Sequence, residues 1–527
     1  MFFNSYEFVF IFLPVTFFIY HGISWFLPFR WALIWLTSAS FFFYGWWYPG
    51  NVVILAGSLL FNYTVGLGLH RAKIANFSLT PRTNKFLFIF GVVGNLGLLS
   101  YYKYYNFFIG NINDAMGTAI SMESLVLPLA ISFFTFQQIG YLRDRWQRQV
   151  IEHTFDYYIL YVVFFPHLIA GPIVQHWELL PQLVQKKFQG FRFDQWAVGL
   201  TIFVLGLFKK VVLADRMAEY ASPVFMKAEQ WANIHFVEAW GGALAYTFQI
   251  YFDFSGYSDM AVGLGLMFGF QLPVNFFSPY KASSIIEFWQ YWHITLSKFL
   301  KNFLYIPMGG NRHGRYGRYR NLMVTMIIGG LWHGAGWTFI LWGMLHGCYL
   351  VVNHAWRGVK KKYGFLRVQR FRLVREWSAR LLTFLAVVIA WVFFRAETFH
   401  GGFTLLQGMA GLHGILLPLG WSRFLPDGGG TLLFSDAFWA FFLGDFGYKQ
   451  WLFILALWVI AWFFPNTFEF MSGYLNLLEQ YLQERIQRPR RFPNWQPRPL
   501  YALGLACLFV SVLSFMYSPS EFLYFQF

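Results

Sequence analysis

The sequence has little charge for its length, and this scarcity is its most informative feature. Of its 527 residues, only 12% are Asp, Glu, Lys or Arg, whereas soluble domains usually carry about 25%. Hydrophobic residues make up 57% of the chain and aromatic residues 23%. Several apolar stretches reach the roughly 20 residues that a helix needs to cross about 30 Å of hydrocarbon. The composition therefore excludes an ordinary soluble domain and predicts an all-α polytopic membrane protein.

Cysteine is nearly absent as well. The two cysteines, Cys348 and Cys507, lie in apolar segments and lack the spacing of a metal site, so we expect small buried hydrophobic residues rather than a disulfide. The sequence also lacks segments of roughly 10 residues with alternating polarity, which a transmembrane β-barrel requires. Neither long repeats nor low-complexity linkers occur, so a single integral membrane domain is expected.

The formal net charge of +16 raises the question of nucleic-acid binding. However, the cations lie in short loops between apolar segments, which is the pattern set by membrane orientation. We therefore expect the lipid bilayer as a partner and no nucleic acid.

Loops rich in Lys and Arg orient the chain, because such loops stay in the cytoplasm. Three are evident, at residues 70–85, 356–380 and 485–498, and they predict extracytoplasmic N- and C-termini. The first apolar segment, Tyr6–Phe26, lacks a basic leader and a small-residue cleavage site, so we expect a retained span. Further spans are expected at Trp31–Trp47, Val52–Leu69, Phe86–Tyr102, Leu125–Leu142, Leu381–Phe394, Trp451–Phe464 and Tyr501–Tyr517. Between residues 157 and 310 the span count stays open.

One apolar run, Leu322–Val352, contains two histidines and no charged residue. Because both flanking loops are basic, we expect the run to enter the membrane and return, bending at residues 334–336, where "GAG" tolerates the backbone angles of a turn. A long tilted helix is the alternative. Either arrangement buries His333, whose neutral imidazole could accept a proton from an attacking hydroxyl. A structural histidine, satisfied by a carbonyl or by a tryptophan N–H, remains the competing interpretation.

A second histidine, His293, lies in "EFWQYWHITLSKFLKNFLYIPMGG". Apolar residues at helical spacings, from Phe288 to Phe303, predict one amphipathic helix at the cytoplasmic interface. His293 is then either a second polar group that stabilises an oxyanion or an interfacial histidine at the headgroup level.

Two carboxylates, Asp253 and Asp259, lie in the apolar run Trp240–Phe270. Each costs about 2.5–3.5 kcal/mol at mid-bilayer, so each needs a partner and is a candidate for function. Their six-residue separation does not place both on one helical face, so no acid–base pair is inferred. Hydrogen bonding that only fixes helix packing is the alternative.

Together these stretches resemble the membrane-bound O-acyltransferase (MBOAT) family, in its bacterial alginate O-acetyltransferase-like branch. The motifs "YFDFSGYSDMAVGLGLMFGF", "FWQYWHITLSKFLKNFLYIPMGGNR" and "GGLWHGAGWTFILWG" occur in order, preceded by "LPLAISFFTFQQIGYLRDRW" and "FFPHLIAGPIV". The resemblance implies roughly ten to twelve transmembrane helices, with re-entrant and interfacial helices around a central tunnel. It divides the chain into a catalytic core, residues 1–352, and a transmembrane extension, residues 353–527, that ends in an extracytoplasmic aromatic tail.

The resemblance also implies roles for particular residues. His333 would be catalytic and His293 the second polar residue of the site. Tyr524, in the tail "EFLYFQF", resembles the proposed acyl relay of some family members, although an aromatic tail is also a common interfacial anchor. The supporting polar residues of the tunnel would be Asp253, Ser255, Asp259 and Trp332.

The implied reaction moves acetyl groups from acetyl-CoA or an acyl-carrier thioester across the bacterial inner membrane. Arg312 and Arg315 are candidate donor contacts, or only orientation charges. No metal or tightly bound cofactor is expected. An extracytoplasmic SGNH-hydrolase-like partner would then acetylate an alginate-like exopolysaccharide.

Alternatives within the family are D-alanyl transfer to teichoic acid and peptidoglycan O-acetylation. A transporter or flippase would instead use Asp253 and Asp259 as coupling sites, but the internal symmetry typical of transporters is not evident in the sequence. A structural scaffold for an export complex is a third possible function.

Overall fold

The computed structural model describes residues 1–71, 81–147, 154–184, 191–230, 232–363, 372–418, 432–435, 448–477, 494–516 and 523. Within these ranges the regular structure is helical, except for the parallel four-residue strands β1 (Ile415–Pro418) and β2 (Leu432–Ser435), in which Ile415 pairs with Leu432. The predicted helical class is confirmed.

The chain forms two compact units that interleave along the sequence. Unit 1 contains Met1–Phe208, Gly256–Asn275 and Thr467–Gln526, and unit 2 contains Lys209–Ser255, Phe276–Asn466 and Phe527. Residue 352 lies within α16 (Trp337–Tyr363), and the division into a catalytic core and a C-terminal extension stays a prediction.

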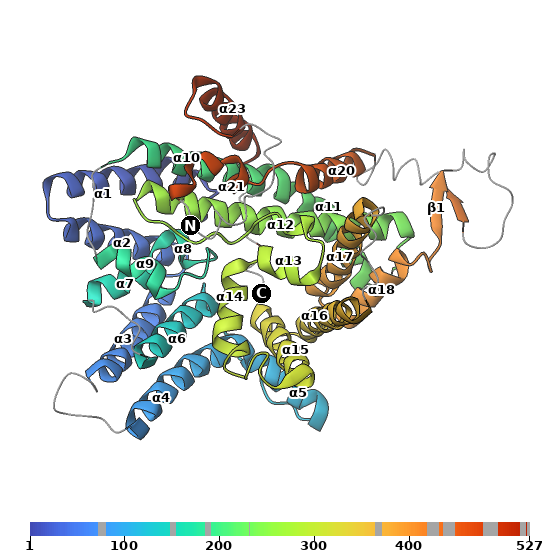
Figure 1. Cartoon of the computed structure of the whole chain (residues 1–527), viewed down its shortest axis with the longest axis horizontal. Coiled ribbons are helices and arrows are strands. Elements are labelled where there is room, and N and C mark those ends of the chain that lie inside the picture. Colours follow the sequence, from blue (N-terminus) through green and yellow to red (C-terminus); the bar gives the residue numbers. More distant parts are fainter. Residues whose placement is uncertain are drawn as a thin grey trace. The chain divides into compact units, whose positions relative to one another are not determined.

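Unit 1 contains the blue and teal helices of Figure 1 and, at the end of the chain, the red helices α21 and α23. Its elements are η1 (Phe8–Phe12), α1 (Leu13–Phe26), α2 (Phe29–Gly45), α3 (Gly50–Arg71), α4 (Pro81–Leu99), η2 (Ser100–Tyr104), α5 (Tyr105–Met116), α6 (Ile131–Gln147), α7 (Phe155–Val163), α8 (Phe165–Leu168), α9 (His176–Val184), α10 (Phe193–Phe208), the second part of α12 (Phe236–Met267), α21 (Thr467–Phe470), η8 (Ser472–Leu477) and α23 (Pro499–Phe515).

Unit 2 holds the candidate site. Its elements are η3 (Lys209–Ala214), α11 (Asp215–Glu229), the first part of α12, η4 (Pro279–Lys281), α13 (Ile285–Tyr291), α14 (Ile294–Leu300), η5 (Lys301–Tyr305), α15 (Gly314–His333), α16, α17 (Arg372–Arg395), α18 (Phe399–Met409), the two strands and α20 (Tyr448–Phe463).

Helices long and apolar enough to cross a membrane confirm a multi-pass membrane protein. The described residues contain five: Phe8–Phe26, Gly50–Leu69, Arg82–Met116, Phe193–Glu229 and Arg372–Arg395. Two shorter apolar helices, Lys449–Phe463 and Pro499–Phe515, add to them. The number of crossings, ten to twelve, stays a prediction.

The span expected at Leu125–Leu142 differs in the structure. Its helix, α6, begins only at Ile131, because Pro128 disfavours a helix in the residue before it and Ala130 has a φ of +60°. Thirteen of the 17 residues of α6 are buried. This helix therefore packs inside unit 1.

Helices α10 and α12 pack at backbone contact inside unit 1. A Cβ at Gly206 would lie 2.6 Å from the carbonyl oxygen of Gly256, and one at Gly263 would lie 2.5 Å from that of Gly199. Glycines on both helices therefore permit the close approach, as is common between membrane helices.

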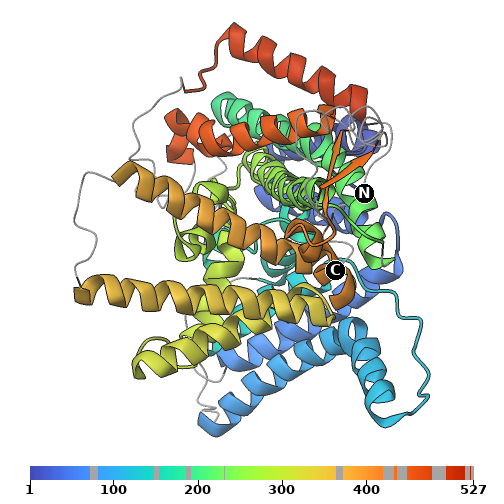
Figure 2. The same ribbon diagram turned by 90° about the vertical axis from the view of Figure 1, so that its right-hand side faces the viewer.

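Helices α15 and α16 form an antiparallel hairpin, seen side by side in yellow in Figures 1 and 2. Residues 334–336 separate them, so the predicted bend is confirmed and the single long helix is wrong. The two backbones touch, because a Cβ at Gly330 would lie 2.2 Å from the Phe339 carbonyl oxygen and one at Gly343 would lie 2.4 Å from that of Met326.

The single amphipathic helix predicted from Phe288 to Phe303 is wrong. The segment forms α13, α14 and η5, and the first break is at His293, which has a φ of +41°. This left-handed conformation cannot continue an α-helix. The burial expected for the cysteines is also wrong, because Cys348 and Cys507 are exposed in the isolated chain.

Candidate active site

His333 lies at the end of α15 inside a cage of aromatic rings. Its side chain is buried, at 3% exposure. Its ring lies 5.1 Å from the ring of Trp342 on α16 and 5.1 Å from that of Phe394 on α17, measured between centroids. Trp332, the preceding residue, is 4.9 Å away. Three helices thus surround one imidazole with apolar rings.

His293 reaches the same site from the break between α13 and α14. It is fully buried, and its ring packs edge-on against Phe254, 4.7 Å away. The ring centroids of His293 and His333 are 6.4 Å apart, and Trp332 lies 6.1 Å from His293. The structure therefore brings together three of the residues that the sequence singles out, while their roles stay predictions.

The environment of His293 keeps its imidazole neutral. The residue lies outside the five helices identified as candidate spans. Burial lowers the pKa of His293 to about 3, from an ordinary value of 6.5, because a charged ring loses its hydration in an apolar surrounding. A neutral imidazole donates a hydrogen bond at one ring nitrogen and accepts one at the other, which suits either acid–base chemistry or oxyanion binding.

Asp253 is held in a buried ion pair. Its Oδ1 lies 2.6 Å from Nζ of Lys210, and Nζ also lies 2.8 Å from Oδ1 of Asp215. The side chains of Asp253 and Lys210 are 2% and 3% exposed. Lys210 belongs to η3, a π-helical segment, and such segments often accompany functional sites. Lys210 thus neutralises the charge of Asp253.

Asp259 belongs to unit 1, whereas His293 and His333 belong to unit 2. Oδ2 of Asp259 accepts a hydrogen bond of 2.6 Å from the hydroxyl of Thr467. Ser255, 1% exposed, is the last residue of α12 in unit 2. The two aspartates therefore have separate partners, and the tunnel that they would line stays a prediction.

Arg312 and Arg315 are exposed, at the opposite end of α15 from His333. Eighteen residues separate Arg315 from His333, which at 1.5 Å per residue is about 27 Å along the helix. Arg315 is therefore far from His333 along α15, and donor binding by the two arginines stays a prediction. Tyr524 lies outside the described residues.

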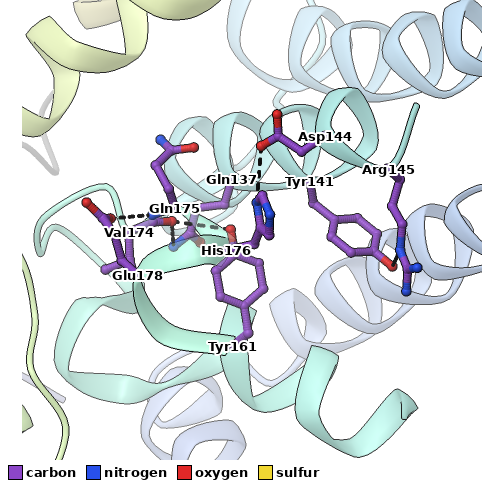
Figure 3. Close-up of polar contacts among 9 residues, drawn as sticks. All are labelled: Gln137, Tyr141, Asp144, Arg145, Tyr161, Val174, Gln175, His176 and Glu178. Atoms are coloured by element: carbon purple, nitrogen blue, oxygen red, sulfur yellow. Dashed lines mark hydrogen bonds and ion pairs between the residues drawn. The ribbon is translucent and has the colours of Figure 1, made fainter. Parts of the chain in front are cut away.

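A second buried polar cluster occurs in unit 1, which the sequence analysis did not assign to a site (Figure 3). Nδ1 of His176 lies 3.1 Å from Oδ2 of Asp144, and both side chains are 2% exposed. Nearby, Tyr161 donates to the carbonyl of Val174 at 3.2 Å, and Arg145 donates to the hydroxyl of Tyr141 at 3.1 Å. The signal was present as polar residues in "FFTFQQIGYLRDRW", a stretch whose helix is almost wholly buried.

Sequence reasoning also missed Lys210, Trp342 and His346. His346 was seen only as the second histidine of the apolar run, and its 0% exposure follows from the hairpin. Among the described residues, no group of three or more His, Cys, Asp and Glu side chains is placed to hold a metal ion.

The chain is similar to proteins that carry out acyl transfer. The model of the membrane-bound O-acyltransferase family matches residues 146–394. A peptidoglycan O-acetyltransferase of Helicobacter pylori is 44% identical over 448 residues, covering 79% of this chain and 81% of that protein. A probable alginate O-acetylase of Pseudomonas aeruginosa is 40% identical over 415 residues, covering 78% and 75%. A teichoic acid D-alanyltransferase of Streptococcus thermophilus is 27% identical over 247 residues, covering 45% and 60%.

Proposed function

Because the chain belongs to the membrane-bound O-acyltransferase family, and is therefore an O-acyltransferase, we propose that it transfers acetyl groups from a cytoplasmic thioester, acetyl-CoA or an acyl carrier, toward an extracytoplasmic polysaccharide. The observation that carries this proposal is the pair of buried histidines, His293 and His333, 6.4 Å apart in one aromatic cage. The family argues against the transporter and scaffold alternatives.

In the proposed reaction His333 is the general base. A hydroxyl oxygen attacks the thioester carbonyl carbon, and His333 takes the hydroxyl proton as the new C–O bond forms. When the tetrahedral intermediate collapses, the C–S bond breaks and the thiolate recovers the proton from His333. His293 hydrogen-bonds a reacting oxygen as a neutral ring. The apolar rings around both histidines keep water away from the thioester, which would otherwise be hydrolysed.

The hydroxyl that attacks first belongs to Tyr524, which acts as an acyl relay at the extracytoplasmic end of the chain. The acetyl group then passes to an SGNH-hydrolase-like partner outside the inner membrane. Support for this route is the family resemblance of the tail "EFLYFQF" and the sidedness predicted from the basic loops.

Two acceptors fit the relatives. The similarity to alginate O-acetylases favours an exopolysaccharide, and that to a peptidoglycan O-acetyltransferase favours the cell wall. Both relatives match most of the chain, so identity alone does not rank the acceptors. D-alanyl transfer has less support, because that relative matches only 45% of the chain.

The test is the acetyl content of secreted polymer and of peptidoglycan in cells that carry His333→Ala or His333→Gln. We expect a loss of about 10²–10⁴-fold in transfer rate, the range of a lost general base. Tyr524→Phe should abolish labelling of the chain by radioactive acetyl-CoA if the relay operates. His313→Ala, a change at an exposed histidine just before α15, is the matched control and should behave as wild type. Unchanged acetylation in both His333 variants at normal protein abundance would overturn the proposal.

A further inference from the structure

His346 is a buried histidine that the proposed mechanism does not use. It lies on α16 with 0% exposure. Its ring lies 5.0 Å from Trp289 of α13 and 4.9 Å from Trp342, one turn earlier on α16. All three residues belong to unit 2. A polar side chain in this position needs hydrogen-bond partners, because an unsatisfied buried group is costly.

The hydrogen bond from Trp289 determines the tautomer of His346. Nε1 of Trp289 lies 3.2 Å from Nδ1 of His346. An indole N–H can only donate, so Nδ1 must be the acceptor. The neutral ring therefore carries its proton on Nε2. His346 presents a fixed N–H donor on the side of the ring away from Trp289.

Two buried N–H donors in this region lack a protein acceptor. Within the described residues, neither Nε2 of His346 nor Nε1 of Trp342 has a hydrogen-bond partner. Both side chains are at most 1% exposed. Buried donors are satisfied in nearly all native proteins, by protein, water or a bound molecule. Two such donors on adjacent rings are therefore available to an oxygen acceptor, from water or from a bound ligand.

Their position connects this donor pair to the candidate active site. The Trp342 ring lies edge-on to His333 at 5.1 Å and contacts His346 at 4.9 Å. Trp342 thus adjoins the candidate general base directly, and His346 packs against Trp342 one turn further along α16.

We propose that the Trp342 Nε1–H and the His346 Nε2–H bind the carbonyl oxygen of the acyl group during transfer, an inference that rests on the proposed function. When the hydroxyl oxygen attacks the carbonyl carbon, the C=O π electrons move to this oxygen and the hydroxyl proton moves to His333. The two N–H donors stabilise the resulting oxyanion. As the C–S bond breaks, the electrons return to the carbonyl and the proton leaves with the thiolate. No other reactant is required.

The experiment compares two amide substitutions with opposite geometry. In His346→Gln the amide nitrogen takes the place of Nε2, so the donor is retained. In His346→Asn the amide takes the place of Nδ1, so the bond with Trp289 is retained and the Nε2 donor is lost. Trp342→Phe removes the other N–H and keeps most of the ring. Each variant is purified, checked for thermal stability and assayed with acetyl-CoA for kcat and KM.

We expect His346→Asn and Trp342→Phe each to lower kcat by about 10²-fold with little change in KM, as for loss of one oxyanion donor. His346→Gln should stay closer to wild type. The reverse order, with Asn active and Gln inactive, would assign His346 a structural role through Trp289 and overturn the inference. Wild-type kcat in both His346→Asn and Trp342→Phe would also overturn it.

A parallel measurement on His333→Ala separates this inference from the proposed function. If His333→Ala is inactive while His346→Asn and Trp342→Phe retain wild-type kcat, only the donor pair is rejected. If His333→Ala is itself fully active, the proposed function fails whatever the other variants do.

Discussion

Individual charges in the apolar segments are matched by partners that are distant in sequence. Lys210 and Asp253 are 43 positions apart, yet their charged atoms lie 2.6 Å from each other. Each alone would carry the cost of a charge in hydrocarbon. Together with Asp215 they form a compact ion cluster in which each charge has an opposite neighbour. Pairing with an opposite charge therefore offsets the free-energy cost of burying each of these side chains.

Removing one member of this pair should destabilise the protein more than removing both. Lys210→Met leaves the Asp253 carboxylate buried without its cation, which typically costs about 3–5 kcal/mol. The double variant Lys210→Met, Asp253→Leu replaces the pair by apolar side chains and should recover much of that loss. Thermal unfolding in detergent, monitored as the loss of monodisperse protein, measures the stability of both variants.

The matched control is the surface pair Arg192–Asp194, at 2.8 Å with side chains 44% and 49% exposed. Arg192→Met should change stability by less than about 1 kcal/mol. A double variant at Lys210 and Asp253 that is less stable than the single variant would show that the pair has a role that apolar packing does not replace.

At the scale of elements, the hairpin of α15 and α16 positions the candidate base. The two helices meet at their backbones near Gly330 and Gly343, and α15 ends three residues after Gly330, at His333. Close packing of the two helices therefore determines the position of His333 relative to Trp342 on α16.

Gly330→Ala should separate these helices. The new Cβ would lie 2.2 Å from the Phe339 carbonyl oxygen, a contact that only a backbone shift relieves, so we expect about 1–3 kcal/mol of destabilisation and a marked loss of transfer activity. Activity and thermal stability are measured together.

Gly358→Ala is the control on α16 itself, because nothing lies within 4 Å of a Cβ at that position. It should be neutral or slightly stabilising, by up to about 1 kcal/mol, since alanine is the better helix former. Equal effects of the two substitutions would contradict a backbone contact at Gly330.

At the scale of the whole molecule, the proposed function requires a defined orientation in the membrane. The basic end of α16, with Lys360, Lys361 and Lys362 in its last turn, is predicted to be cytoplasmic. The segment between Tyr102 and Leu125, which contains α5, has one cation, Lys103, and is predicted to be extracytoplasmic. A donor and an acceptor on opposite sides depend on this arrangement.

Cysteine labelling tests the orientation. In a background with Cys348→Ala and Cys507→Ala, a membrane-impermeant maleimide applied to intact spheroplasts should label Asp114→Cys and not Lys361→Cys. Both native residues are exposed. After permeabilisation both positions should react. Labelling of Lys361→Cys alone in intact spheroplasts would reverse the orientation and remove the proposed direction of transfer.

The sequence by itself determined the membrane class, the helical fold and the family. These properties depend on composition, on the lengths of apolar runs and on local motifs, all of which a chain displays in order. The bend at residues 334–336 was also predictable, because two glycines and two basic flanks are local signals.

Only the tertiary structure decided which polar residues meet. It paired Lys210 with Asp253 and assigned Asp259 to the other unit. It also broke the predicted helix at His293, whose ring lies 6.4 Å from that of His333. It also brought Trp289 to His346 across 57 positions of sequence. Such contacts depend on how helices pack, because the partner that satisfies a buried charge or donor lies on another element, and periodicity along one segment contains no information about it.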